Sequence, residues 1–266
     1  MNTGSTWRGQ GGCFRSFREV MNGYFDKVYC IVSLWENLMA LSGRREMNRS
    51  DYDVERPENY DALVPLVIPR WEEFYETAAS YIPHNARRVL ELASGTGILT
   101  VKIRERVFGC DITCIDSNPG MIEIARTKQS LCDVRFIEGD IRHAWPEGPF
   151  DAVITTQCLI AFSAVERARI AEKAYQNLSD GGLFIDGDVF SPGNQWEFDY
   201  YCGRFREFMR TNGLSQEMAE KMIGPLDTLI GDYTVADLRS LLTRAGFSHT
   251  AIPYQNELYG IGLGIR

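Results

Sequence analysis

The chain has 266 residues, of which 44% are hydrophobic and 24% charged, a composition typical of a globular protein and unlike that of a disordered one. The formal net charge is −8, and it is unevenly placed: residues 1–50 hold seven basic and four acidic side chains, which leaves 21 basic and 32 acidic ones in residues 51–266. Because nucleic-acid affinity comes largely from basic side chains that neutralise phosphates, this acidic region argues against a nucleic-acid substrate.

Cysteine, histidine and apolar content bear on metal binding and location. The seven cysteines form no CxxC pair and the three histidines are widely spaced, so we expect reduced thiols and no metal site. No apolar run reaches the length of about 18 residues that spans a bilayer. The first residues also lack the basic–apolar–small order of a signal peptide. These features predict a cytoplasmic protein with no membrane contact.

Residues 1–50 are predicted to form a helical extension. Between Phe14 and Leu41 the apolar residues recur at helical spacing, which favours an amphipathic helix. This helix is interpreted as a packing element, as an arm through which a homodimer forms, or as a lid over a site. A start at Met47 would make residues 1–46 dispensable. The sequence leaves these alternatives open.

Residues 51–266 are predicted to form one α/β domain. Residues 60–80 have a helical pattern that is interrupted near Pro65 and Pro69. Strands and helices then alternate, which indicates a mainly parallel sheet with helices on both faces. The predicted strands are 88–92, 111–115, 134–137, 152–155, 183–186, 248–252 and 258–263. The predicted helices are 98–107, one opening at Asn118-Pro119, one from the capping box Ser163–Glu166 to Gly181-Gly182, and one from Thr234 to Arg244.

The segment Val89–Gly97 (VLELASGTG) lies between a predicted strand and a predicted helix. Gly95 and Gly97 let the backbone approach a ligand closely and present N–H groups at the start of the helix. A dinucleotide fingerprint GxGxxG is not present, because positions 93 and 100 are Ala and Thr. The alternative to a ligand site is a turn that serves packing alone.

Asp116 ends the second predicted strand, 25 residues after Glu91. A carboxylate at that position can accept hydrogen bonds from both ribose hydroxyls of a nucleoside. The alternative role is to cap the helix at Pro119, which Ser117 or Asn118 would serve equally well. Met121, in the first turn of that helix, is suited to pack on an adenine face.

These segments resemble the motifs of class I methyltransferases that depend on S-adenosylmethionine (SAM). The first motif is matched by E-x-A-x-G-x-G at 91–97, and further motifs are matched, in order, by Glu138-Gly-Asp140-Ile141, Phe150–Gln157, Leu178–Ile185 and Ala245–Phe247. The resemblance spans about residues 57–266. It implies a Rossmann-like, mainly parallel seven-stranded sheet with an antiparallel last strand. It also implies an enzyme that uses SAM as its cofactor and a small molecule as its methyl acceptor.

The resemblance also implies a cofactor site. Asp140 and Ile141 would meet the edge of adenine, and Gln157 would lie beside the methionine moiety. Two aromatic residues before the core would fold over the cofactor, although they equally suit core packing. The full implied set is Glu91, Ala93, Gly95, Gly97, Asp116, Ser117, Met121, Asp140, Ile141 and Gln157, with Tyr60 and Trp71 as the aromatic residues.

The sequence looks closest to small-molecule methyltransferases and to carboxy-SAM synthases, which are linked to tRNA modification. Those synthases hold the extra carboxylate with an arginine, which would fall near Ile223, where this sequence has no arginine close by. Many family members also carry a histidine pair where this chain has Ile160-Ala161. The missing arginine argues against the synthase. Two alternatives to a methyltransferase are kept: such a synthase, and a SAM-binding protein without catalysis.

Methyl transfer from a sulfonium is an in-line displacement, for which proximity alone supplies about 7–11 kcal/mol. No Ser–His–Asp or Cys–His pairing is apparent, and no general base is identified. Residues 190–232 are predicted to form a substrate cap whose aromatic residues suit an organic molecule, or else only bury the cap helix. The side chains expected to face the substrate are Gln157, Cys158, Asp188, Tyr200, Tyr201 and Arg204, with His143 near the adenine turn.

Overall fold

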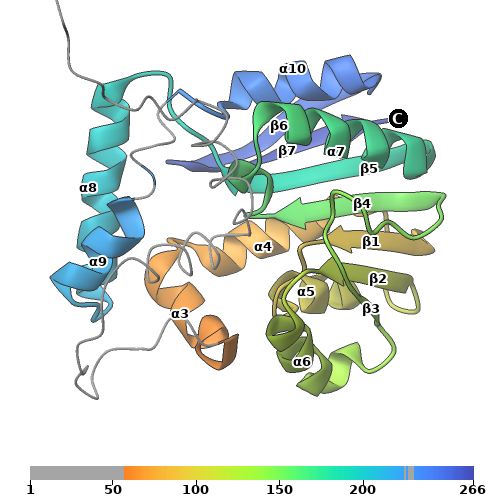
Figure 1. Ribbon diagram of the computed structural model, residues 1–266, viewed down its shortest axis with the longest axis horizontal. Helices are drawn as coiled ribbons and strands as arrows, with labels where there is room; N and C mark the ends of the chain where they lie inside the picture. Colours follow the sequence, from red (N-terminus) through yellow and green to blue (C-terminus); the bar gives the residue numbers. More distant parts are fainter. Residues whose placement is uncertain (1–56, 225, 227–230) are drawn as a thin grey trace, which may run out of the picture.

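The computed structural model describes residues 57–224, 226 and 231–266. The extension predicted for residues 1–50 lies outside the described residues, as does the part of the predicted cap at 225 and 227–230. The described residues contain a seven-stranded sheet with the strand order β3-β2-β1-β4-β5-β7-β6 (Figure 1). The strands are β1 Arg88–Leu92, β2 Asp111–Asp116, β3 Arg135–Glu138, β4 Phe150–Thr156, β5 Leu178–Val189, β6 His249–Asn256 and β7 Tyr259–Ile265.

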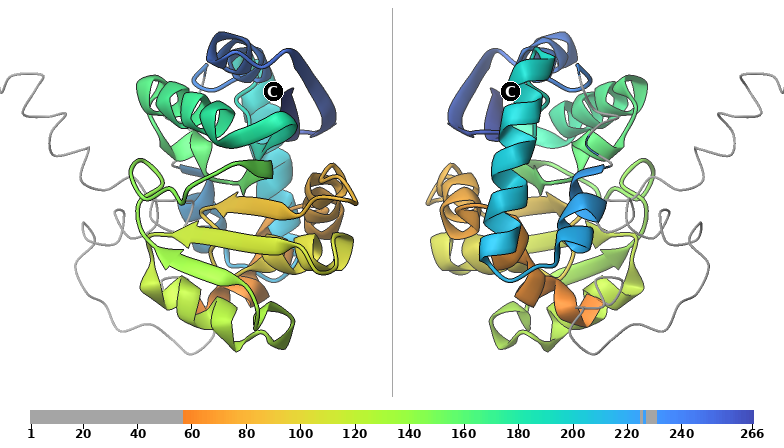
Figure 2. Two further views of the ribbon diagram at one scale, coloured as in Figure 1. Left: turned by 90° about the vertical axis from the view of Figure 1, so that its right-hand side faces the viewer. Right: turned by 90° about the vertical axis from the view of Figure 1, so that its left-hand side faces the viewer.

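Helices cover both faces of this sheet. Helices α4 and α5 pack together on one face, and α7 and α10 pack together on the other (Figure 2). The helices are η1 Pro57–Asn59, α3 Tyr60–Val67, α4 Trp71–Ser80, α5 Ile98–Arg106, α6 Pro119–Thr127, η2 Gln129–Leu131, η3 Leu159–Ala161, α7 Ala164–Asn177, α8 Gln195–Thr211, α9 Gln216–Ile223 and α10 Val235–Ala245. Within the described residues, no helix combines the length and the apolar character that crossing a bilayer requires.

The pairing of the strands confirms the predicted fold class. Strands β1 to β5 pair in parallel, with β1 between β2 and β4. Strand β7 is antiparallel to both of its neighbours, β5 and β6, and its Ile265 pairs with Leu183 of β5. The central strands are apolar because both of their faces are covered by helices, and four of the five residues of β1 are buried.

Three helix starts follow the local signals in the sequence. The Asn118 side chain accepts hydrogen bonds from the N–H groups of Gly120 and Met121, and Pro119 opens α6. Ser163 and Glu166 form a complete capping box at α7, and Thr234 and Asp237 form another at α10. Gly246 ends α10 in the left-handed conformation, as expected for a glycine just past a helix.

Two expected boundaries are wrong. The helix before β1 is not interrupted at Pro65, which lies inside α3; the break is at Pro69 alone, where Ile68 is extended and Arg70 has a φ of 57°. Helix α7 ends at Asn177 rather than at Gly181-Gly182. Those glycines belong to a longer β5, since Gly181 donates to the carbonyl of Arg266, and Arg266 donates to the carbonyl of Gly182.

The predicted cap contains α8 and α9, which lie beyond the carboxyl ends of β1 and β4 (Figure 1). Phe198 and Phe205 on α8 are buried in the core. Trp196 and Tyr200 stack on each other with ring centroids 5.5 Å apart, and are 71% and 52% exposed. The aromatic residues of the cap therefore divide between core packing and the surface.

Strand β7 has glycines at the alternate positions 260, 262 and 264. At each of them the backbone lies against a packed side chain. At Gly264 an added Cβ would lie 2.8 Å from Cγ and Cδ1 of Phe247. That ring is held in turn by Tyr175 and Phe184, whose ring centroids are 5.3 Å and 5.9 Å away. The glycine lets the strand and the ring approach each other, and the ring has little room to move.

We therefore expect Gly264→Ala to lower the free energy of unfolding by about 1–3 kcal/mol, because it overpacks the core. Urea unfolding measures this change. The control is Gly203→Ala in α8, where an added Cβ meets no atom within 4 Å. It should stabilise the protein by up to about 1 kcal/mol, the usual gain for alanine in a helix interior. Equal effects of the two changes would contradict the packing described for β7.

Candidate functional site

A cavity of about 350 Å³ opens at the carboxyl ends of β1 to β4. Its walls come from the loops that follow these strands and from α3 and α4. A parallel sheet forms such a crevice where its strand order reverses, here between β1 and β4. The lining residues are Tyr60, Tyr75, Ala93, Ser94, Gly95, Thr96, Ile98, Leu99, Asp116, Ser117, Asn118, Pro119, Met121, Gly139, Asp140, Ile141, Thr156, Cys158 and Phe162.

The loop after β1 turns sharply, with positive φ values at Ala93, Gly95 and Gly97. An added Cβ at Gly95 would meet no atom within 4 Å, so this lining residue leaves room for a ligand against the backbone. At Gly97 an added Cβ would lie 2.8 Å from Leu131. Gly97 is the N-cap residue just before α5 and does not line the cavity, so its contribution is to let the loop pack closely.

Asp116 joins the end of β2 to this loop. Its carboxylate accepts hydrogen bonds from the backbone N–H of Gly95 at 2.7 Å and of Asn118 at 2.8 Å. Asn118, not Asp116, caps α6, which excludes the capping role as the reason for this carboxylate. Burial raises the pKa of Asp116, and its hydrogen bonds to main-chain N–H groups act against that rise. Ser117 and Met121 line the cavity beside it.

Glu91 lies in the core and does not line the cavity. Its carboxyl group accepts a hydrogen bond from the Cys114 thiol at 3.6 Å. Burial raises its pKa to about 8, so the side chain is mostly neutral at pH 7. Glu91 therefore supports the strands beneath the loop rather than contacting a ligand in the cavity.

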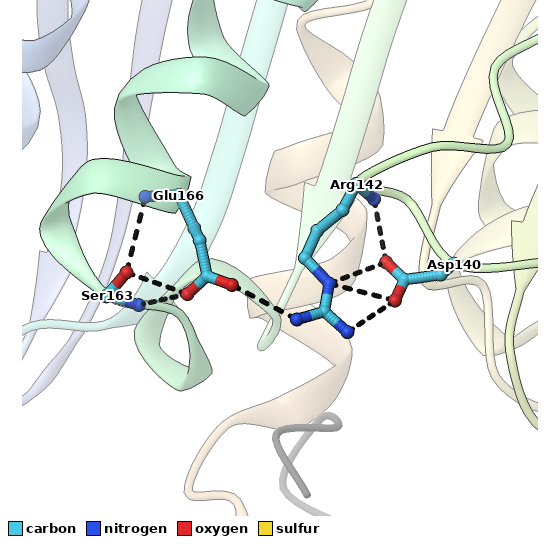
Figure 3. A network of polar contacts seen from close by, with 4 residues as sticks. All are labelled: Asp140, Arg142, Ser163 and Glu166. Carbon is cyan, nitrogen blue, oxygen red and sulfur yellow. Dashed lines mark hydrogen bonds and ion pairs between the residues drawn. The ribbon is translucent and has the colours of Figure 1, made fainter. Parts of the chain in front are cut away.

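The loop after β3 places Asp140 and Ile141 in the cavity wall. The Gly139 N–H donates to the carbonyl of Asp116 at 2.8 Å, which holds this loop beside β2. The Asp140 carboxylate is bound by the guanidinium of Arg142, which also reaches Glu166 (Figure 3).

The loop after β4 is strained at Gln157, which has a φ of 51° and is buried. Its N–H donates to the carbonyl of Gly187 at 2.7 Å, and its amide Nε2 donates to the Tyr75 hydroxyl at 2.6 Å. Tyr75 and Cys158 line the cavity, whereas Gln157 does not. Gln157 thus acts on the cavity through Tyr75.

Helix α3 is tied to the wall of the cavity that it covers. Tyr60 lines the cavity, and the next residue, Asp61, accepts a hydrogen bond from the Thr96 hydroxyl at 2.5 Å. The other oxygen of Asp61 pairs with Lys128 at 2.6 Å. Trp71, the second expected aromatic residue, does not line the cavity and instead packs edge-on against Tyr75.

Several side chains expected to face a substrate lie elsewhere. Asp188 accepts hydrogen bonds from the N–H groups of Cys158, Ile160 and Val189, so it holds the η3 turn instead of entering the cavity. Arg204 pairs with Glu257. Of this group only Cys158 lines the cavity, and the residues that do not are His143, Gln157, Asp188, Tyr200, Tyr201 and Arg204.

The sequence reasoning missed several lining residues. Tyr75 lies one helical turn after Trp71, and this spacing was the one signal that could have pointed to it. Phe162 follows η3 with no motif to mark it. Ser94, Thr96 and Thr156 lie inside the recognised motifs but were not singled out. Within the described part of the chain, no three His, Cys, Asp or Glu side chains are grouped to hold a metal ion.

Two fully buried carboxyl groups, Asp186 and Asp188, lie on β5 beneath the η3 turn. The Tyr233 hydroxyl donates to Asp186 at 2.5 Å. Burial raises the pKa of both groups, that of Asp188 to about 7, and the charge of Asp188 adds to the rise at Asp186. Arg167, which stacks on the Tyr233 ring at 4.2 Å, opposes the rise at both.

This pair predicts a specific pH dependence of stability. An aspartate has a pKa of about 3.9 in an unfolded chain. Because the folded pKa of Asp186 is higher, its contribution to stability is present at low pH and is lost as the pH rises through the folded pKa. We expect Asp186→Asn to remove this loss, so the unfolding free energy of the variant rises relative to the unmodified protein as the pH is raised above about 4, the pKa of an unfolded aspartate.

Urea unfolding at several pH values measures the difference. Asp180→Asn is the matched control, since Asp180 is exposed on the same strand. A difference between Asp186→Asn and the unmodified protein that stays constant with pH would contradict the raised pKa.

Comparisons with known proteins agree with this geometry. Residues 89–182 match the family of methyltransferase domains. Carboxy-S-adenosyl-L-methionine synthase of Citrobacter koseri is 26% identical over 216 residues, which cover 76% of this chain and 87% of that protein. The synthase of Klebsiella pneumoniae is 27% identical over 222 residues, covering 79% and 90%.

Two solved structures share the fold. Human N-acetylserotonin methyltransferase in complex with SAM superposes with a TM-score of 0.55 at 19% identity, covering 80% of this chain and 56% of that one. An O-methyltransferase family protein from Burkholderia thailandensis gives a TM-score of 0.59 at 15% identity, covering 94% and 70%. At these identities the likeness establishes the fold alone.

Proposed function

We propose that this chain, which belongs to the class I SAM-dependent methyltransferases, transfers the methyl group of SAM to a small organic molecule. The observation that carries the proposal is the cavity at the reversal of strand order. There a glycine turn and the Asp116 carboxylate meet, 2.7 Å apart through the Gly95 N–H. SAM supplies an electrophilic methyl group on a positively charged sulfur.

The residues of the cavity fit SAM. Gly95 leaves space against its backbone, and the charged side chains that line the cavity in the described residues are the two carboxylates Asp116 and Asp140. These two carboxylates suit the ribose hydroxyls and the adenine amino group, which donate hydrogen bonds. Asp116 accepts hydrogen bonds from the main-chain N–H groups of Gly95, Asn118 and Ser117, which leaves about one of the roughly four acceptor positions of a carboxylate for a ribose hydroxyl.

We assign the remaining positions by where they lie in the wall. Met121 packs on the adenine face, and Asp140 with Ile141 meets the adenine edge. Tyr60 covers the cofactor from α3, which the Asp61 contacts to Thr96 and Lys128 hold in place. The expected site residues that do not line the cavity support the lining residues from behind. They are Glu91, Gly97, Gln157 and Trp71.

Tyr75, Thr156, Cys158 and Phe162 form a wall without a charged side chain, which we assign to the end where the methyl group is transferred. In the reaction the acceptor's lone pair forms the new bond to carbon while the carbon–sulfur bond breaks toward sulfur. This wall aligns the acceptor with the methyl group and excludes water. Holding the two reactants close together in this way accelerates the transfer. An acceptor that needs no strong base to lose its proton suits this surface.

The size and charge of the site favour a small acceptor. A volume of about 350 Å³ lies within the range of about 300–1,000 Å³ that is usual for small-molecule sites, and because the cofactor occupies this cavity it leaves room only for a small acceptor beside it. Residues 51–266 carry 32 acidic and 21 basic side chains, which disfavours a nucleic-acid acceptor. Residues 190–232 remain our candidate for the segment that selects the acceptor, and residues 1–50 for a dimerising arm or lid.

The second candidate function is synthesis of a carboxylated SAM, favoured by the two relatives at 26% and 27% identity. Against it, no arginine or lysine lines the cavity within the described residues. Ile223, where the carboxylate-holding arginine of such a synthase would fall, is buried at the end of α9.

Asp116→Asn should weaken the binding of S-adenosylhomocysteine (SAH), the demethylated product, about 10- to 150-fold. This range corresponds to the loss of hydrogen bonds to a charged group, about 1.5–3 kcal/mol. Isothermal titration calorimetry measures it. Asp111→Asn, at the exposed far end of β2, is the matched control and should bind as the unmodified protein does. SAH binding by Asp116→Asn at full affinity would remove the ribose assignment.

Mass spectrometry of the ligand that copurifies with the protein separates the two candidate functions. We expect SAM or SAH, because no cationic side chain is placed in the described cavity wall to hold a second carboxylate. Recovery of carboxy-SAM would favour the synthase instead. Transfer of a labelled methyl group from SAM to a component of a metabolite extract then distinguishes an enzyme from a protein that only binds the cofactor.

A further inference from the structure

Two stretches that are far apart in the sequence line the cavity and are joined by one side chain, Arg142. The first stretch is Gly139–Ile141 after β3, and the second contains Cys158 and Phe162 after β4. Arg142 follows the first stretch directly and reaches toward α7, which follows the second (Figure 3).

Arg142 donates hydrogen bonds to the Asp140 carboxylate from both its backbone N–H and its side chain. The Arg142 N–H donates to Oδ1 of Asp140 at 2.8 Å, and Nε lies 3.0 Å from Oδ1 and 2.8 Å from Oδ2. Nη2 donates to Oδ2 at 2.5 Å. These contacts leave the carboxylate one orientation, in which it borders the cavity.

The other arm of the guanidinium reaches the start of α7. Nη1 of Arg142 donates to Oε1 of Glu166 at 3.1 Å. The second oxygen of Glu166 accepts from the N–H and the hydroxyl of Ser163, at 3.0 Å and 2.7 Å, and so closes the capping box. The guanidinium carbon also lies 6.0 Å from the ring centre of Phe162, a lining residue.

In this network one cation, Arg142, lies between two carboxylates, Asp140 and Glu166, and it stabilises the charged form of both. Burial acts to raise the pKa of Asp140, but the hydrogen bonds and charge of Arg142 outweigh it and hold the pKa below its usual range. The pKa of Glu166 is also lowered, because its bonds to Ser163 and Arg142 outweigh burial. The side chains of Asp140, Arg142 and Glu166 are 24%, 26% and 17% exposed, so they are only partly screened by solvent.

We propose that Arg142 is a positioning residue for the cofactor. It holds the Asp140 carboxylate toward the adenine amino group and joins that contact to the capping box of α7, so that binding of SAM steadies both walls of the cavity. The inference rests on the proposed function, since it assumes adenine beside Asp140.

The geometry of Arg142 allows it to hold Asp140 in place and still leave that carboxylate able to contact adenine. Three N–H groups of Arg142 contact the Asp140 carboxylate, so about one of its roughly four acceptor positions is left for an N–H group of adenine. Lysine would carry the same charge without the planar fork, and so could not hold Asp140 and Glu166 in one geometry. The role therefore depends on arginine and not on positive charge alone.

The test compares Arg142→Met, Arg142→Lys and Glu166→Gln with the unmodified protein by calorimetry with SAH. We expect Arg142→Met to weaken binding about tenfold, equivalent to about 1.4 kcal/mol. Arg142→Lys should recover only part of this loss. Arg169→Met is the control for loss of positive charge, because Arg169 is exposed on α7, and it should bind SAH at full affinity.

The pH dependence of binding gives a readout that a purely structural role would not change. Without Arg142, burial raises the pKa of Asp140, so the SAH affinity of Arg142→Met should fall as the pH is lowered from 7 to 5, more steeply than that of the unmodified protein. The other charged groups near Asp140 are His143 and Glu166, with Lys173 beyond His143. They are present in both proteins, so the difference between the two profiles reports on Arg142.

Hydrogen exchange tests the link between the two walls. In the unmodified protein SAH should slow exchange of the amides at 163–168, which do not line the cavity. Glu166→Gln keeps an acceptor for Ser163 but loses the charged contact with Arg142, and should lose this protection. It also keeps the inference testable if Arg142→Met fails to fold.

Equal affinities and pH profiles for Arg142→Met and the unmodified protein would overturn the role of Arg142. Tighter binding by Arg142→Met would overturn it too, because Arg142 would then compete with adenine for Asp140. Full protection of 163–168 in Glu166→Gln would overturn the link between the walls. Failure of the unmodified protein to bind SAH would overturn the proposed function itself, which separates the two conclusions.

Discussion

The reversal of strand order between β1 and β4 is the constraint on which the site depends. Helices cross to one face of the sheet after β1 and to the other after β4, so the carboxyl ends of these two strands diverge and leave a crevice. The 2.7 Å contact between the Gly95 N–H and Asp116 then secures the loop that borders it. The ribose assignment to Asp116 and the open backbone at Gly95 depend on these two features.

The backbone is strained where it leaves the two central strands. Ala93 and Gln157 have φ values of 54° and 51°, a conformation that costs residues other than glycine roughly 1–3 kcal/mol. The surrounding contacts hold Gln157 in this state through Gly187 and Tyr75. Both sharp turns direct the chain around the cavity, which agrees with a site whose geometry is set before a ligand arrives.

The electrostatic groups around the cavity fall into three layers. Asp116 and Asp140 border the cavity, and main-chain N–H groups and Arg142 hold them. Behind the wall, Asp188 holds the η3 turn and Glu91 supports the strands below the glycine turn. The rest of the wall, at Tyr75 and Phe162, has no charge, so the acidic side chains come from the ends of β2 and β3 and the uncharged wall from α4 and the segment after β4.

The sequence alone determined the seven strands, the glycine turn, the capping boxes at Ser163 and Thr234 and the position of Asp116 at the end of β2, because each follows from backbone geometry within a few residues. Only the tertiary structure decided which side chains reach the cavity. Tyr75 enters it while Trp71 does not, Asp188 turns to η3, and Arg142 meets Glu166 24 residues away. These outcomes depend on how distant elements pack, and a local pattern carries no information about that packing.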